Sequence, residues 1–404
     1  MTQPPTVRFR SLVSTSAAAV VMSTLPFFLA GSLAHEFRAE FGFSLVEVGL
    51  MSSAFFGMMA LSGIPIGRAV DRVPARVALL TAVGLATISL AAIPTVATTF
   101  PVLAGILALA GAANAISEAT TNRLLSEAIP PHQLASAVSF KQAAPAFAST
   151  LTGLALPSVV FFFGWRANYL LGVVAGLVLM ILLVRSRRVP LGHGRRAASG
   201  PLRRPGPVAL LVLTLAGGFG ASSAVLAFFV ESSVSGGWSA GAAGWVLAAA
   251  STAAIVARLF SGVVVDRTRL DGLGLTAILI GTGSVGFVLL SFEAPAVVAS
   301  GAILALGGTW GFAGVFFSAV IQNFPRSAGR VTGVVQIGAA GAVAFPAAFG
   351  AIAERFGYAP AWWSAAVLAL FAATLAFSAR QMLRRALVDA SGAAAVTTDA
   401  RDSG

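Results

Sequence analysis

Twelve long apolar runs fill most of the sequence and limit the folds that it can adopt. They cover approximately residues 12–34, 45–66, 77–97, 101–123, 135–162, 165–185, 207–231, 241–263, 272–292, 296–320, 331–352 and 359–380. A helix needs about 20 apolar residues to cross the hydrocarbon core of a bilayer. Because the runs are continuous and do not alternate with polar residues, they predict transmembrane helices and not the strands of a membrane barrel.

Charged residues are too scarce for a water-soluble protein. They make up 10% of the 404 residues, against about 25% in an average soluble domain. The apolar share of 57% also excludes intrinsic disorder. The chain has no cysteine, and its three histidines, His35, His132 and His193, lie too far apart for metal-ligand spacing. With no Gly-rich phosphate loop either, we expect no enzyme activity, no metal and no cofactor.

The basic residues follow the positive-inside rule of membrane proteins. Lys and Arg number 26 against 14 acids, which gives a net charge of +12. If both termini are cytoplasmic, twenty bases lie in cytoplasmic segments and three, Arg38, Arg166 and Arg355, on the other side. The remaining three, Arg123, Lys141 and Arg258, lie within or at the edge of the membrane. The basic surplus therefore indicates topology and not nucleic-acid binding.

The two halves of the chain carry matching landmarks at a constant offset of 195 residues. The pairs are Glu36 with Glu231, Gly49 with Gly244, Gly67-Asp71-Arg72 with Gly262-Asp266-Arg267, and Pro130 with Pro325. Parallel repeats of this kind are a transporter architecture. The repeat predicts an N-terminal six-helix bundle (1–184), a basic cytoplasmic linker (185–206), a C-terminal six-helix bundle (207–385) and a disordered cytoplasmic tail (386–404).

The loop between the second and third runs carries a recognisable motif. Its sequence, residues 67–76, is GRAVDRVPAR. It resembles the signature Gly-x-x-x-Asp-Arg-x-Gly-Arg-Arg/Lys of the major facilitator superfamily, and departs from it at Pro74 and Ala75. A shortened copy, Gly262 to Arg267, occupies the equivalent loop of the second half. On these motifs and the twelve runs, the chain is identified as a suspected member of that superfamily across residues 10–385.

This resemblance implies an all-α integral membrane protein with twelve transmembrane helices in two pseudo-symmetric six-helix bundles. Helices 1, 4, 7 and 10 would line a central cavity, and the bundles would rock around it in alternating access. The function implied is secondary active transport of a small molecule. We expect a monomer in a bacterial plasma membrane, with both termini cytoplasmic.

The motif loops are the predicted conformational switch. The first copy contains Gly67, Asp71, Arg72 and Arg76, and the second contains Gly262, Asp266 and Arg267. Gly67 would let two helix ends approach closely, and Asp71 would cap a neighbouring helix N-terminus. Glu127, at the end of the fourth run, is a plausible partner for the arginines. The alternative is a charge cluster that only sets topology.

Ionisable residues within the apolar runs are the best candidates for a transport site. A charged side chain in hydrocarbon costs at least about 2.5–3.5 kcal/mol, so such residues are seldom kept without a role. Glu118 shares a helix face with Asn114 and Asn122, and is the predicted proton carrier. Lys141, the only lysine of the chain, is predicted to contact the substrate or to pair with Glu118.

The two intramembrane arginines have a structural alternative. Arg258 precedes Gly262 and Asp266 in a pattern that resembles the substrate-binding arginine of monocarboxylate and oxalate carriers, but the same spacing also serves structural roles. For Arg123, pairing with Glu127 or the nearby loop is favoured over substrate contact. Further pathway candidates are Gln142, Gln336, which is the repeat counterpart of Lys141, and Trp310. Phe27, Phe28, Phe228 and Phe229 lie on nominal cavity helices and are expected mainly to pack.

Three bases and one acid within or near the membrane favour an anionic substrate. We therefore expect a small organic anion that moves together with a proton. The alternative is a drug–proton antiporter, although the fifth run keeps only the proline, Pro145, of the glycine-rich motif of those proteins. A membrane sensor that does not transport, or a channel, is a remote third reading.

Overall fold

The computed structural model describes residues 6–70, 72–128, 137, 140–185, 205–268, 271–324, 331 and 334–402. Within these residues the chain forms helices joined by short loops, without a β-strand. Twelve helical stretches are long and apolar enough to cross a membrane. The predicted all-α fold with twelve transmembrane helices is therefore confirmed.

The first six spans form the N-terminal bundle. They are α1 (Thr6–Ser32), α3 (Leu45–Val70), α4 (Ala75–Val96), α5 (Phe100–Ala128), a fifth span that includes α7 (Ala144–Ala155), and α9 (Trp165–Arg185). The short helix α2 (Ala34–Phe41) connects the first two spans. The fifth span continues from α7 through a π-helical turn, η1 (Leu156–Val160), and the short α8 (Phe161–Phe163). Pro157 lies in this turn, which fits its inability to donate a backbone hydrogen bond.

The last six spans form the C-terminal bundle. They are α10 (Pro205–Ser235), α11 (Ala240–Thr268), α12 (Gly272–Leu289), α13 (Pro295–Thr309) with α14 (Ala313–Asn323), η2 (Gln336–Ala340) with α16 (Gly341–Phe356), and α17 (Tyr358–Asp402). The tenth span is broken at Trp310, Gly311 and Phe312, between α13 and α14. The eleventh begins as the 3₁₀-helix η2. Both irregular stretches lie in the C-terminal bundle beside the central cavity described below.

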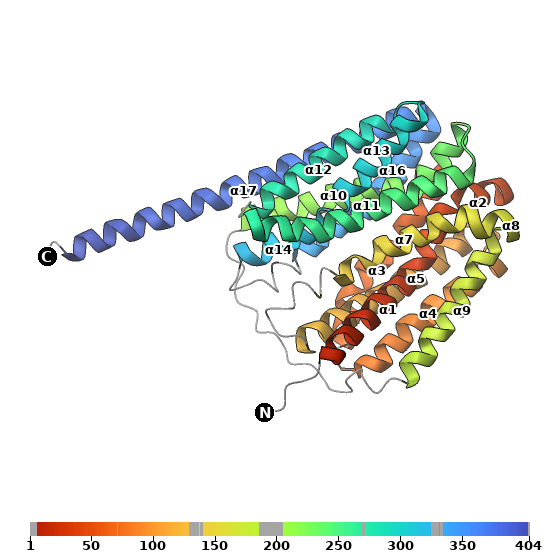
Figure 1. Ribbon diagram of the computed structural model, residues 1–404, viewed down its shortest axis with the longest axis horizontal. Helices are drawn as coiled ribbons and strands as arrows, with labels where there is room; N and C mark the ends of the chain where they lie inside the picture. The colour runs from red at the N-terminus through yellow and green to blue at the C-terminus, as the bar shows by residue number, and fades with distance from the viewer. Residues whose placement is uncertain are drawn as a thin grey trace.

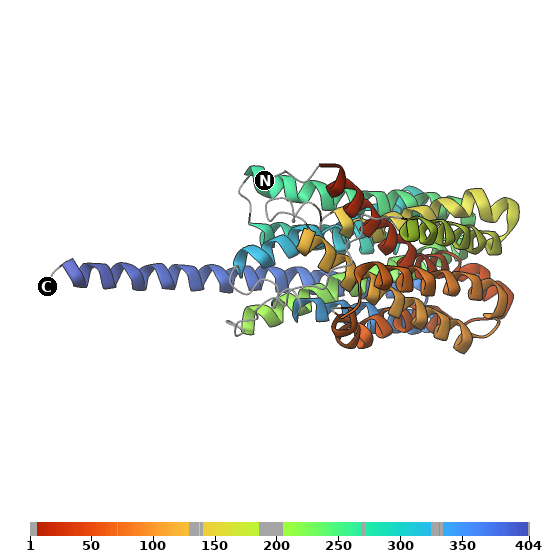
Figure 2. The same ribbon diagram turned by 90° about the horizontal axis from the view of Figure 1, so that it is seen from below.

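The two bundles lie side by side, and three pairs of spans make most of the contact between them (Figures 1 and 2). These pairs are α3 with α16, α7 with α11, and α1 with α10. The first two pairs are related by the sequence repeat, since α3 corresponds to α11 and α16 to α7. A Cβ at Gly49 on α3 would overlap the carbonyl of Pro346, and one at its repeat counterpart Gly244 would lie 2.5 Å from Gly153 O. The repeat therefore places a glycine at each symmetric inter-bundle contact.

The bundles are in contact at the end where α2 and α8 lie, which we call the α2 end. In Figure 1 the bundles converge at this end and diverge toward the opposite one, where α1 begins and α17 leaves the bundle. Glu231 on α10 accepts hydrogen bonds from Arg38 and from His35 Nδ1 (2.9 Å) of α2. The Glu231 side chain is 3% exposed, whereas those of His35 and Arg38 are 39% and 33% exposed, so a buried carboxylate joins the two bundles through partly exposed bases.

A second ion pair at the α2 end holds α2 against its own bundle. Arg166 on α9 donates to Glu40 at 2.5 Å, and Trp165 Nε1 donates to the same carboxylate at 2.8 Å. These two hydrogen bonds, with Arg166 as the larger contribution, lower the pKa of the Glu40 carboxyl. The pair lies on the surface and leaves the contact between the bundles unaffected.

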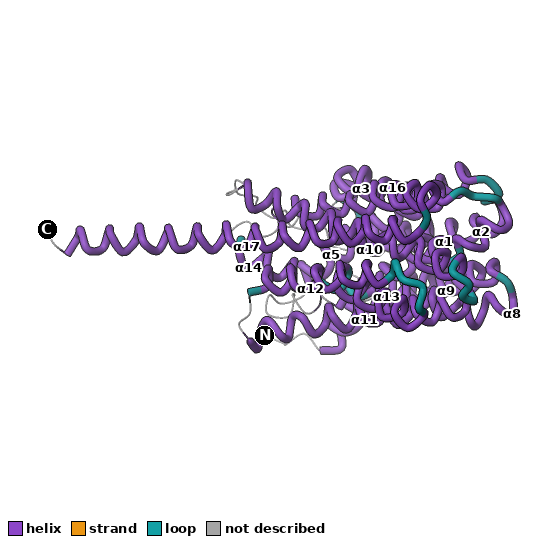
Figure 3. The backbone as a smooth tube through the Cα atoms, turned by 90° about the horizontal axis from the view of Figure 1, so that it is seen from above, coloured by secondary structure: helices purple, strands orange, loops and turns teal. Residues whose placement is uncertain are grey.

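The C-terminal segment differs from its expected form. Its Ala, Ser, Thr and Asp content predicted disorder for residues 386–404, whereas α17 continues as helix to Asp402 and extends beyond the bundles (Figures 1 and 3). Alanine has the highest helix propensity of all residues, and no proline interrupts this stretch. Composition alone therefore underestimated how far a helix that is already formed in α17 can continue.

Candidate functional site

A cavity lies between the two bundles near the middle of the spans. It contains about 790 Å³ of space free of protein atoms, counting its open mouth, which is within the range of small-molecule sites. Its walls come from α1, α3, α5, the start of the fifth span, α10, α11, α14, η2 and α16. The lining residues are Thr24, Phe28, Phe55, Phe56, Met59, Asn114, Glu118, Gln142, Pro145, Phe219, Ser222, Ser223, Leu226, Arg258, Trp310, Ala313, Gln336, Ala339 and Ala342.

Glu118 and Lys141 form an ion pair at the wall of this cavity. Lys141 Nζ donates to Glu118 Oε2 at 2.5 Å and to Asn122 Oδ1 at 2.8 Å. The lysine side chain is 0% exposed, whereas that of Glu118 is 25% exposed and lines the cavity. The predicted pairing of these residues is thus present, and the carboxylate is the member that the cavity can reach.

Arg258 on α11 lines the same cavity but is bound by the backbone. Its Nε donates to Trp310 O at 2.9 Å, and its Nη1 donates to Gln142 O. The guanidinium lies 5.1 Å from the centre of the Trp310 ring, at cation–π distance. These carbonyls come from both bundles, and Trp310 lies at the break between α13 and α14, where backbone carbonyls lack their usual helical donors. Arg258 therefore joins the bundles beneath the cavity.

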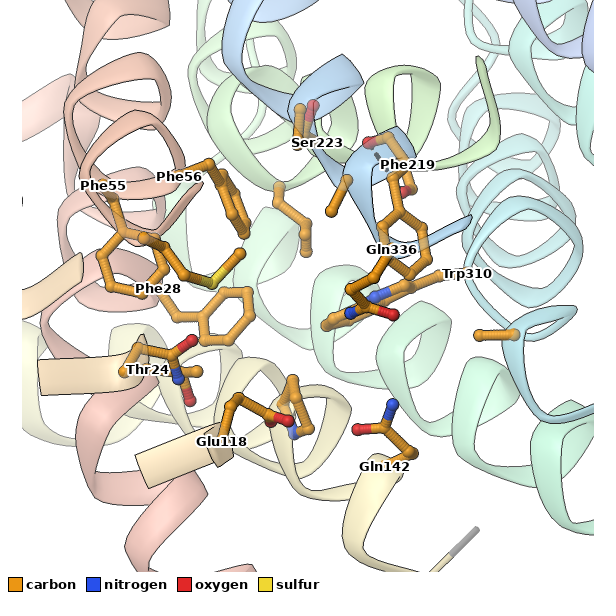
Figure 4. Close-up of a pocket in the computed structure, with 18 of the residues that line it drawn as sticks. Thr24, Phe28, Phe55, Phe56, Glu118, Gln142, Phe219, Ser223, Trp310 and Gln336 are labelled. Atoms are coloured by element: carbon orange, nitrogen blue, oxygen red, sulfur yellow. Dashed lines mark hydrogen bonds between the residues drawn. The ribbon is translucent and has the colours of Figure 1, made fainter. Parts of the chain in front are cut away.

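Of the other polar candidates, Asn114 is hydrogen-bonded to a neighbouring helix, whereas Gln142 and Gln336 keep side-chain amides that can bind a substrate. Asn114 Nδ2 donates to Ser23 Oγ of α1 at 3.0 Å, which links two helices of one bundle. The side-chain amides of Gln142 and Gln336 line the cavity from opposite bundles, and neither has a hydrogen-bond partner within the described part of the chain. Figure 4 shows Glu118 and Gln142 at one side of the cavity and Gln336 beside Trp310 at another.

Aromatic side chains cover much of the remaining wall. Phe28, Phe55 and Phe56 face the cavity from the N-terminal bundle, with Trp310 and Phe219 opposite (Figure 4). The rings of Phe28 and Trp310 lie 5.7 Å apart across the two bundles. The cavity thus combines apolar surfaces with one carboxylate, one guanidinium and three amides, those of Asn114, Gln142 and Gln336.

Arg123 lies away from the cavity, near the end of α5. It donates to Val70 O and, at 3.2 Å, to Val73 O in the motif loop, and its Nε is 3.9 Å from Glu127. Glu127 therefore faces Arg123, four residues before it on the same helix, as one of the two roles suggested for Glu127 predicted. The preferred structural role of Arg123 agrees with these contacts.

The motif loops are described in part. Arg76 Nε donates to Leu183 O at 2.9 Å, which ties α4 to α9 within one bundle. A Cβ at Gly67 would meet no atom of the described residues within 4 Å, so the expected close approach of two helix ends there is absent in this conformation. Arg72 lies exposed in the turn after α3. Asp71 lies outside the described residues. In the second copy, Gly262, Asp266 and Arg267 are described only as part of helix α11.

Sequence reasoning missed several cavity residues, but its expectation that Phe228 and Phe229 mainly pack agrees with their burial. Phe228 and Phe229 on α10 are buried in the core, whereas Phe219 and Ser223 of the same helix line the cavity. The signal for them was the repeat, because an offset of 195 relates Thr24 to Phe219 and Phe28 to Ser223. Phe55, Phe56 and Met59 on α3 had no such signal, since α3 is not one of the nominal cavity helices.

A cavity enclosed by two six-helix bundles, with charged groups at mid-span, defines the protein as a membrane transporter. The Major Facilitator Superfamily model matches residues 12–345, and the chain belongs to this family. No curated protein matches the sequence.

Solved structures of the same fold include a bacterial homologue of the human lysosomal transporter Spinster. Its inward-facing, unoccupied form has a TM-score of 0.74 and 15% identity, covering 95% of this chain and 99% of that one. Its inward-facing, occupied form has a TM-score of 0.73 and 16% identity, with coverage of 94% and 98%. The transporter FucP in its outward conformation has a TM-score of 0.63 and 15% identity, with coverage of 92% and 99%. At these identities the likeness establishes the fold.

Proposed function

We propose that this transporter exchanges an amphipathic small molecule, with an apolar or aromatic body and a cationic or hydrogen-bond-donating head, for protons. Its substrate would bind in the central cavity and cross by alternating access of the two bundles. The carrying observation is that Glu118 presents a partly exposed carboxylate to a cavity lined by aromatic rings and amides, in which the one lining guanidinium, that of Arg258, is already bound to backbone carbonyls. This was the second of the two readings that the sequence left open.

The positions of the bases, and not their number, favour this reading. The anion preference came from counting three bases against one acid. Lys141 is fully buried behind Glu118, and Arg123 lies away from the cavity, bound to backbone carbonyls. Arg258 already donates to two carbonyls and stacks on Trp310. Glu118 Oε1, by contrast, accepts no hydrogen bond from a described residue and is free to receive a donor from the substrate.

Proton coupling follows from competition for one carboxylate. A proton on Glu118 removes the negative charge that attracts a cationic head, so the proton and the substrate exclude each other. Exposure of Glu118 first to one side of the membrane and then to the other would convert this exclusion into antiport. Under this proposal the protein is a multi-pass protein of a bacterial plasma membrane with cytoplasmic termini, and transport proceeds in a monomer.

A small organic anion remains the second candidate, because the guanidinium of Arg258 also reaches the cavity. Protonation of Glu118 would then remove the counter-charge of Lys141 and leave a net positive charge beside the cavity to attract a carboxylate, and proton and anion would move together. The two candidates predict opposite charge preferences at the same site, so one experiment separates them.

The test is transport in proteoliposomes under an imposed pH gradient. Ethidium, a lipophilic aromatic cation, and benzoate, an aromatic carboxylate, serve as probes. We expect ethidium to move against the proton flux, and Glu118→Gln to abolish its dependence on the gradient. Glu293→Gln, which changes an exposed loop carboxylate, is the matched control and should behave as wild type. Movement of benzoate with the protons, together with no movement of ethidium, would establish the anion candidate instead.

A further inference from the structure

A groove on the outer surface of the C-terminal bundle lies between α12 and α17, which pack side by side. It contains about 1070 Å³ of space free of protein atoms, including its open side. Ile278, Leu370 and Phe377 line it and are 63%, 55% and 44% exposed. Since α12 and α17 are spanning helices, these apolar side chains face the lipid.

The floor of the groove is apolar and open. A Cβ at Gly281 would meet no described atom within 4 Å, so the glycine leaves room above the helix. The two hydroxyl side chains in the wall are internally satisfied, since Thr374 donates to Phe371 O at 2.7 Å and Ser378 to Thr374 O at 2.8 Å. The groove therefore offers a hydrocarbon chain a channel without a polar group that needs a partner.

Arginines close one end of the groove, where α12 begins. Arg380 Nε lies 2.7 Å and Arg384 Nε 3.3 Å from the same oxygen, Asp271 Oδ2. The other oxygen, Asp271 Oδ1, accepts from Leu273 N at 3.0 Å and caps α12. One carboxylate is thus shared by two guanidiniums, and Arg384 remains 60% exposed. This end of the groove carries a net positive charge that an anion can neutralise.

We propose that this groove binds a phospholipid with an anionic headgroup. One acyl chain would lie over Gly281 and along Ile278 and Leu370, while the headgroup phosphate would accept hydrogen bonds from Arg384 and Arg380. A guanidinium donates to phosphate through paired N–H groups, and basic side chains at the membrane surface attract anionic lipids. The arginines and the open groove floor lie on the same two helices, so a single lipid can engage both.

Native mass spectrometry of the full chain, released from micelles that contain equal amounts of phosphatidylglycerol and phosphatidylcholine, tests this site. We expect wild type to retain phosphatidylglycerol in preference. Arg384→Gln should reduce that preference about fivefold, the equivalent of about 1 kcal/mol per basic side chain at a membrane surface. Gly281→Leu fills the floor and should reduce retention of the same lipid with all charges unchanged. Arg355→Gln, which removes an exposed charge at the α2 end, is the matched control.

Equal retention of the two lipids by wild type would overturn the proposal. An Arg384→Gln variant that keeps the wild-type preference would do the same, and because Arg384 is largely exposed, its replacement leaves the fold intact. Paired copies of the chain without bound lipid would assign the groove to a protein contact and also reject the proposal. The outcome does not depend on what the central cavity transports.

Discussion

Replacing Glu118 with glutamine should destabilise the protein more than replacing Lys141 with methionine, although the two residues form one ion pair. The asymmetry comes from their surroundings. Lys141 is 0% exposed, so Glu118→Gln leaves an ammonium group inside the bundle with neutral amide acceptors and no counter-charge. Glu118 is 25% exposed, so loss of Lys141 leaves a carboxylate that cavity water can still reach.

The expected magnitudes follow from these exposures. Removing one partner from a buried ion pair costs about 3–5 kcal/mol, because the other charge is left uncompensated. Glu118→Gln should fall in this range. Lys141→Met leaves a partly solvated carboxylate, and about 1–3 kcal/mol is the expected cost of such an unsatisfied group. The double variant contains no buried charge at this place, and should therefore be more stable than Glu118→Gln alone.

Unfolding of the purified variants in mixed micelles, followed by tryptophan fluorescence, measures this order. Asn122→Ala, which removes the second acceptor of Lys141, should add to the effect of Glu118→Gln because it takes a further hydrogen bond from an ammonium group that has already lost its counter-charge. Glu293→Gln should stay within about 0.5 kcal/mol of wild type, as surface substitutions do. If Lys141→Met proves as damaging as Glu118→Gln, or if the double variant is the least stable, the burial asymmetry does not control this pair.

Three further outcomes are expected from contacts at or near the α2 end. Glu231→Gln removes the carboxylate that His35 and Arg38 share across the bundles. The chain has no native cysteine, so spin labels on one introduced cysteine in each bundle at the α2 end should report longer distances between the bundles in this variant. An unchanged distance distribution would show that Glu231 does not hold the bundles together. The side chain of Gly244→Leu would overlap Gly153 O, and this variant should be less stable than wild type by about 1–3 kcal/mol. The same change at Gly281, where the space is open, should leave stability unchanged. Equal melting temperatures of the two variants would contradict the close contact at Gly244. The lowered pKa of Glu40 means that its contribution to stability is present above the ordinary carboxyl value of 4.5 and is lost as the pH falls through the folded value. Wild type should therefore lose more thermal stability than Glu40→Gln between about pH 5 and pH 3, and parallel losses would show that the pair contributes nothing.

The sequence predicted the parts of this protein that depend on local chemistry. Apolar runs of membrane length give twelve spans because backbone groups in lipid must be bonded within each helix. The repeat offset also paired Gly49 with Gly244, and the structure places both at contacts between the bundles, since a duplicated fold repeats its close approaches. Rare charges within apolar runs pointed to Glu118, Lys141 and Arg258, because such residues are expensive to keep.

The tertiary structure decided what those charges can do. Sequence could count Lys141 and Arg258 as positive groups, but it could not show that Glu118 covers the lysine or that the backbone of Trp310 and Gln142 binds the arginine. Exposure and hydrogen-bond partners depend on helices that are far apart in the chain. The sequence by itself thus determined a membrane transporter with a few candidate charges. Only the packing of the two bundles placed Glu118 at the cavity, Lys141 out of solvent and Arg258 against backbone carbonyls, and this arrangement supports the cationic substrate that we propose.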